Sequence, residues 1–237
     1  MNKENTLFAI AGLLLGVIIG FLFANSLNRN AGTPVSASTV MSQNSNMPPG
    51  HPEVPAGNQN SPQAMMNAPE VQAAIEKAKN EPNNFEAQIK AADFYYQIER
   101  YDEAISSLQQ ANKLKPEDYE VIVQLGNTYF DSNKFEEAEK WYSQALSKKP
   151  EDVNVRTDLG LTFLLRNPPN YDRSILEFKH SLETDPKHIK TLQNLTVAYT
   201  RKGDAANAKA TVAKIESLEP KNDTIPKLKD QINKIGS

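Results

Sequence analysis

The sequence predicts an all-α protein whose C-terminal part is a solenoid of about four helix-turn-helix units, and two observations carry this prediction. Prolines recur at spacings of 34, 34, 36 and 34 residues, at Pro82, Pro116, Pro150, Pro186 and Pro220. Each of the last four closes a segment with the apolar periodicity of an amphipathic helix, such as YDEAISSLQQANKLKP. Because proline cannot continue a helix, each one marks the end of one unit and the start of the next.

The same small and aromatic positions recur in every unit. The second unit shows them best, with Leu125, Gly126 and Tyr129 in its first helix and Ala138 and Tyr142 in its second. We expect these positions to be core rather than chemistry. The units are predicted over residues 85–118, 119–152, 153–188 and 189–222, inside a domain of residues 69–237.

A period near 34 residues with two helices in each unit resembles the tetratricopeptide-repeat family. The resemblance implies that the units stack into a right-handed solenoid whose first helices line a concave groove. Gly126 and Gly160 are expected to let the two helices of a unit approach closely. Two extra residues in the stretch RNPPNYD explain the one spacing of 36.

A solenoid needs capping elements at both ends to remain soluble. At the start, residues 70–80 are predicted to form a lone helix with Pro69 in its first turn. At the end, a closing helix is predicted within residues 223–235, with its apolar residues on one side and Asp223 or Thr224 as its cap.

Residues 1–24 are predicted to be a transmembrane anchor. Leu7 to Phe23 is uncharged, and its helical length of about 25 Å approaches the roughly 30 Å of a bilayer core. The alternative is a signal segment that is cleaved near the small residues Ala24 to Ser26. If the segment is retained, the glycines of the row Gly12, Gly16 and Gly20 fall on one helical face and are candidates for a contact between membrane helices.

Residues 25–68 are rich in Asn, Ser, Pro, Gly and Gln, and we expect them to be a disordered linker. Lys3 precedes the apolar segment, and Arg29 is the only basic residue between that segment and Lys77. This distribution favours a single-pass protein with a cytoplasmic N-terminus and a periplasmic or extracellular repeat domain.

The groove implied by the resemblance has an apolar and aromatic middle, with acids toward the first units and bases toward the last. Such a lining suits a peptide with apolar side chains. The predicted groove residues are Ile89, Asp93, Tyr96, Val123, Asn127, Phe130, Leu161, Leu164, Val197 and Arg201. An alternative for Leu164 and Leu165 is packing under the insertion of the third unit. Some family members bind C-terminal carboxylates through a clamp of Lys, Asn and Arg, but only Asn127 matches a place of that clamp.

The predicted function is a membrane-tethered scaffold that binds partner polypeptides in an envelope assembly process. The layout of anchor, linker and repeats resembles bacterial membrane-anchored tetratricopeptide proteins, including accessory subunits of cytochrome c maturation. A self-associating structural membrane protein and a secreted soluble protein are the alternatives. The net charge of −3 gives no reason to expect nucleic acid as a partner. With no cysteine, three scattered histidines and no phosphate loop, neither catalysis nor a cofactor or metal is expected.

Overall fold

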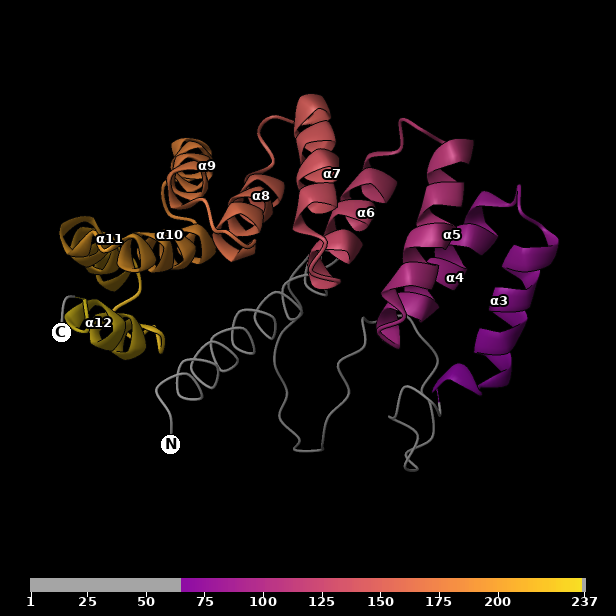
Figure 1. Ribbon diagram of the computed structural model, residues 1–237, viewed down its shortest axis with the longest axis horizontal. Helices are drawn as coiled ribbons and strands as arrows, with labels where there is room; N and C mark the ends of the chain where they lie inside the picture. Colours follow the sequence, from indigo (N-terminus) through magenta and orange to yellow (C-terminus); the bar gives the residue numbers. More distant parts are fainter. Residues whose placement is uncertain (1–64, 236–237) are drawn as a thin grey trace, which may run out of the picture. The chain divides into compact units, whose positions relative to one another are not determined.

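The computed structural model describes residues 65–235, which contain ten α-helices and no strand. Within this unit each helix packs against the next one along the chain (Figure 1). The all-α solenoid predicted from the sequence is confirmed for these residues. The helices are α3 (Pro69–Asn80), α4 (Phe85–Gln97), α5 (Tyr101–Leu114), α6 (Tyr119–Asp131), α7 (Phe135–Lys148), α8 (Val153–Leu165), α9 (Tyr171–Thr184), α10 (Ile189–Lys202), α11 (Ala205–Leu218) and α12 (Ile225–Asn233).

Local sequence signals set where the helices begin and end. The helices α6 and α8 each start after an aspartate, Asp118 or Asp152, whose carboxylate accepts a hydrogen bond from the backbone N–H three residues later. Such a bond satisfies one of the free N–H groups in the first turn. At the other end, α5 stops at Leu114 and α7 stops at Lys148, each two residues before a repeat proline. The proline period therefore marks the ends of the second helices.

Two glycines let the helices within a unit pack closely. A Cβ atom added at Gly126 would lie 2.7 Å from the ring of Tyr142, and one added at Gly160 would lie 2.5 Å from the ring of Phe178. Both rings come from the second helix of the same unit and are essentially inaccessible, with 1% and 0% of their surface exposed. The role predicted for the two glycines is confirmed, because neither position has room for a side chain.

Five residues, 166–170, separate the two helices of the third unit, whereas the first and second units use three. This difference accounts for the longer proline spacing seen in the sequence. The extra residues do not disturb the start of α9, because the Asn170 side chain accepts a hydrogen bond from the backbone N–H of Arg173.

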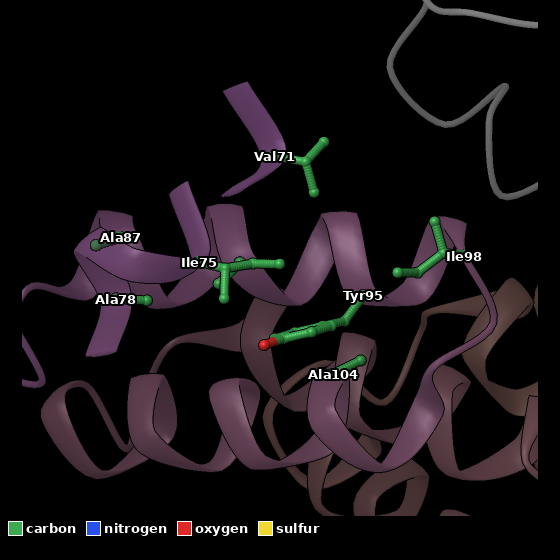
Figure 2. Packing of buried hydrophobic residues seen from close by; sticks show 8 residues of the cluster. Val71, Ile75, Ala78, Ala87, Tyr95, Ile98 and Ala104 are labelled. Atoms are coloured by element: carbon green, nitrogen blue, oxygen red, sulfur yellow. The ribbon is translucent and has the colours of Figure 1, made fainter. Parts of the chain in front are cut away.

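The start of the solenoid is covered by α3. Val71 and Ile75 of this helix lie in one buried cluster with Tyr95 and Ile98 at the end of α4 (Figure 2). Met65 and Met66 pack partly buried against the same cluster, so the last residues of the expected linker already contribute apolar contacts to the repeat unit.

The other end is closed by α12, which packs on α10 and α11. Ile225, Leu228 and Ile232 are buried on one side of it, as the apolar spacing predicts. The prediction that the side chain of Asp223 or Thr224 caps the first turn of α12 is wrong. Thr224 occupies the N-cap position, but its hydroxyl donates to the side chain of Asn222 at 2.6 Å instead of bonding the first turn.

The predicted anchor of residues 1–24, its glycines Gly12, Gly16 and Gly20, and most of the linker predicted at residues 25–68 lie outside the described residues. Between residues 65 and 235, no helix combines the length and the apolar character that crossing a membrane requires.

Candidate functional site

The predicted groove residues all lie on the first helices of the four units, α4, α6, α8 and α10. In each helix they are spaced three or four residues apart, or seven at most, so they share one face. Within the described unit, α6, α8 and α10 lie on the inner side of the curve, while α7 and α9 lie on the outer side (Figure 1). The first helices therefore line one continuous surface, and α8 also contacts α10 directly.

The accessibility of these residues divides them into two groups. Four apolar residues in the middle of the surface are buried, with 6% of Val123, 5% of Phe130, 0% of Leu161 and 1% of Leu164 exposed. The others keep accessible surface, namely Ile89, Asp93, Tyr96, Asn127, Val197 and Arg201. The buried four form the floor beneath this surface, and the accessible six are the residues that a ligand could contact first.

At the junction of the first two units, Tyr96 and Asp131 connect α4 to α6. The hydroxyl of Tyr96 donates a hydrogen bond to Oδ2 of Asp131, and the Tyr96 ring lies edge-on to Tyr101 with centroids 5.7 Å apart. Burial raises the pKa of the Asp131 carboxyl to about 6, and the nearby charge of Asp158 adds to this shift. The hydrogen bond from Tyr96 and the charge of Lys190 oppose the shift.

The same junction also changes the two phenols. Burial, with the negative charge of Asp131 as the second cause, raises the pKa of Tyr96 far above its ordinary value and the pKa of Tyr101 to about 12. Both hydroxyls therefore stay protonated at neutral pH, and Tyr96 remains a donor to Asp131. This pair holds the last turns of α4 and α6 together.

A buried ion pair connects the third and fourth units. The ammonium of Lys190 on α10 lies 3.2 Å from Oδ1 of Asp158 on α8, and only 7% of each side chain is exposed. A buried charge is costly unless it is paired, so this contact satisfies both groups. Asp158 was not among the predicted groove residues, although it lies three residues before the predicted Leu161 on the same helix, a spacing that indicates one face.

Asn127, the one residue that matches a place of the carboxylate clamp, is already engaged within its own unit. Its Oδ1 accepts a hydrogen bond from the hydroxyl of Tyr142 at 2.9 Å. The amide therefore helps to hold α6 against α7, and its oxygen already accepts a hydrogen bond from within the unit.

Arg201, near the C-terminal end of α10, is in a different position. Burial lowers the pKa of its guanidinium, and the nearby phenol of Tyr171 opposes this shift. No carboxylate of residues 65–235 forms an ion pair with it. Lys202, the next residue, is exposed and pairs with Asp172 at 2.5 Å. The groove thus contains a partly buried cation without an acidic ion-pair partner in the part of the chain that the structure describes.

Nothing in the described helices resembles a metal centre. No group of three or more histidine, aspartate or glutamate side chains among residues 65–235 is arranged to hold a metal ion. His188 Nδ1 lies 2.6 Å from Thr191 Oγ1 at the start of α10, where Thr191 is fully buried. A buried hydroxyl of this kind stabilises the fold and cannot reach a substrate.

Comparisons with known proteins agree with the geometry. Two tetratricopeptide-repeat family models match the chain, one over residues 68–119 and the other over residues 99–157. The comparisons support the tetratricopeptide-repeat family. The first match begins next to α3, so this helix is matched together with the first repeat unit.

Solved structures of tetratricopeptide proteins share the fold. A crystal structure of MamA is 24% identical, with a TM-score of 0.58 over 64% of this chain and 87% of that one. MamA from Desulfovibrio magneticus RS-1 is 20% identical, with a TM-score of 0.58 over 68% and 93%. YrrB, described as a TPR protein with an unusual peptide-binding site, is 19% identical, with a TM-score of 0.59 over 73% and 94%. A search of the curated proteins found no match.

Proposed function

We propose that this protein is a membrane-tethered scaffold that binds partner polypeptides on the surface formed by α4, α6, α8 and α10. The observation that carries the proposal is the make-up of that surface. Accessible polar and apolar residues, including Asp93, Tyr96 and Val197, surround a buried apolar floor. Such a lining suits a peptide that brings both apolar and polar side chains. The peptide-binding site of YrrB, a protein with the same fold, supports this use of the fold.

The tethering half of the proposal rests on the sequence alone. An uncharged segment, Leu7 to Phe23, would anchor the chain, and the polar residues after it would allow the repeat domain to move near the membrane. In this proposal the N-terminus is cytoplasmic, the repeat domain is periplasmic or extracellular, and the chain has no catalytic activity of its own. Assembly of an envelope complex, with cytochrome c maturation as one example, is the kind of process in which such a scaffold would act.

The groove is tested by exchanging one exposed charge. Asp93→Lys should reduce recovery of partner proteins that are cross-linked to the full chain in membranes, because Asp93 is an exposed acid of α4 on the groove side. Glu183→Lys is the matched control, since it makes the same charge change at an exposed position on α9, an outer helix. Equal recovery from both variants and from the unmodified chain would show that partners bind elsewhere or not at all.

The tether is tested separately by intact mass. A chain that retains residues 1–24 has the full mass in the membrane fraction, whereas cleavage near Ala24 to Ser26 gives a shorter chain in the soluble fraction. The second result would overturn the anchor and leave the groove proposal in place.

A further inference from the structure

One row of residues crosses the groove at the same place in every unit. Gln97, Asp131, Leu165 and Arg201 are equivalent residues near the C-terminal ends of the first helices, at spacings of 34, 34 and 36 that match the proline spacings. We refer to these four residues as the helix-end row. Its two charged members have similar surroundings, because Asp131 is close enough to Tyr101 to raise its pKa, and Arg201 lies close to Tyr171. Each tyrosine begins the second helix of the preceding unit.

Charge changes along this row. Asp131 is an acid in the second unit, Leu165 is apolar in the third, and Arg201 is a base in the fourth. Both charged groups are in surroundings that disfavour their charge, since burial raises the pKa of Asp131 to about 6 and lowers the pKa of Arg201. Largely buried charges in proteins are normally paired, because an unpaired one has lost its water without gaining a partner.

The charged groups elsewhere in the solenoid follow that rule. Glu177, with 3% of its surface exposed, lies within 3.2 Å of Arg156 and 3.1 Å of Arg173. Lys190 has Asp158. Arg201 on the groove side is only partly buried, but no carboxylate of residues 65–235 forms an ion pair with it. A guanidinium matches a carboxylate with two parallel hydrogen bonds, so the group it lacks is a carboxylate.

The distance along the row limits what fits. Asp131 and Arg201 lie on the first helices of the second and fourth units, which are two helix-to-helix steps apart. At roughly 10 Å for each step, the separation is about 20 Å. An extended chain in the polyproline II conformation rises about 3.1 Å per residue with three residues per turn. It covers this distance in about six residues and places every third side chain on the same face.

We propose that the helix-end row binds an extended partner segment carrying a basic side chain against Asp131, an apolar one against Leu165 and an acidic one against Arg201. The acidic side chain lies within the segment and forms a two-bond ion pair with the guanidinium. This inference rests on the proposed binding of polypeptides in the groove and states the chemistry of the polypeptide. The order of the charges along the row also sets the order in which the basic, apolar and acidic side chains of the segment lie along the solenoid.

The probe is an acetylated and amidated heptapeptide with lysine first, leucine fourth, glutamate seventh and serine at the other positions, labelled for fluorescence anisotropy. A second peptide carries the same residues in reverse order, because the direction of the partner backbone is not set by side chains alone. A third replaces both charged residues by glutamine. A fourth ends in a free carboxylate with glutamine in place of glutamate, so that a terminal carboxylate is distinguished from a side chain. The protein is the full chain in a non-ionic detergent.

One of the two charged peptides should bind, and Arg201→Gln should weaken it by about ten- to a hundredfold, the effect of losing hydrogen bonds to a charged group. Lys202→Gln is the matched control, because it removes the same charge one residue away at an exposed position, and it should leave binding within about twofold. Added salt should weaken the charged peptide more than the glutamine peptide.

The results separate this inference from the proposed function. Two results would overturn the proposal that the charges of the helix-end row bind the segment and would leave groove binding in place. One is that the glutamine peptide binds as tightly as the charged ones, and the other is that Arg201→Gln behaves like Lys202→Gln. If the free-carboxylate peptide alone depends on Arg201, the internal acidic side chain is wrong. If none of the four peptides binds, the proposed ligand of the helix-end row is overturned, and the recovery experiment with Asp93→Lys decides the proposed function by itself. Arg201→Lys, which keeps the charge but not the two-bond geometry, should bind between the unmodified chain and Arg201→Gln.

Discussion

Replacing Asp131 by asparagine should stabilise the protein, and the gain should depend on pH. The structure places this carboxyl where burial raises its pKa from 3.8 to about 6, with the charge of Asp158 adding to the shift and the Tyr96 hydrogen bond and the Lys190 charge opposing it. Asparagine has the same shape and keeps an oxygen that can accept the hydrogen bond from the Tyr96 hydroxyl. The substitution therefore removes the charge and little else.

The sign follows from the direction of the shift. Because the folded protein binds this proton more tightly than the unfolded chain does, the free energy of unfolding falls as pH rises from 3.8 through 6. Two pKa values about 2.2 units apart give a cost at Asp131 of about 0.5 kcal/mol at pH 4, about 1.6 kcal/mol at pH 5 and about 3 kcal/mol at pH 7. The asparagine side chain has no such cost, so Asp131→Asn should exceed the unmodified chain in stability by these amounts.

Urea unfolding of both proteins, followed by far-ultraviolet circular dichroism at pH 4, 5 and 7, measures the difference directly. Other carboxylates titrate over the same range, but they are common to both proteins and cancel in the comparison. A difference that stays constant with pH would mean that the Asp131 carboxyl titrates normally in the folded state. A variant less stable than the unmodified chain at pH 7 would mean that the charge itself stabilises the junction between α4 and α6, which would refute the reasoning.

Three further substitutions test the packing. Gly160→Ala should lower the free energy of unfolding by up to about 2 kcal/mol, because the clash with the Phe178 ring exceeds the gain in helix propensity. Phe178→Leu in the same chain should reduce that loss. A Gly160→Ala variant that is more stable than the unmodified chain would contradict the close approach of the two helices. Tyr142→Phe should cost about 1 kcal/mol by removing the hydrogen bond to Asn127, seen as a lower urea midpoint. Leu228→Ala should cost about 2 to 5 kcal/mol and expose the last repeat, measured as faster amide exchange in α11, while unchanged exchange there would show that α12 is not a cap.

The sequence predicted the fold because repetition multiplies weak signals. A single proline or glycine says little, but equivalent residues that recur four times define both helices of a unit and the step to the next one. The close approach at Gly126 and Gly160 was also predictable, since large aromatic residues, Tyr142 and Phe178, occupy the matching places of the second helices.

The groove was less predictable, because helical spacing gives the face on which a residue lies and not the depth at which it lies. Leu161 and Leu164 were correctly placed on the first helix, yet they are buried to 0% and 1% exposure. Asp131 and Asp158 lay on the same face, but the importance of each depends on a partner from another unit, Tyr96 or Lys190, which lies about 30 to 35 residues away in the sequence. Such cross-unit pairs depend on the stacking geometry, which the period alone does not give.

The two kinds of charge in the solenoid differ in what they do for the fold. Lys190 and Asp158 compensate each other, so that pair holds neighbouring units together and has no charge left for a ligand. Asp131 and Arg201 are disfavoured by burial, and a neutral side chain in place of Asp131 would make the folded protein more stable by about 3 kcal/mol. A solenoid can tolerate this loss, since its stability is the sum of many unit interfaces and is not concentrated in one core. Charges that reduce stability where they stand are expected at positions that act on something outside the fold. The two charged residues of the helix-end row, Asp131 and Arg201, have this property, and a segment that brings the opposite charges would relieve both costs at once.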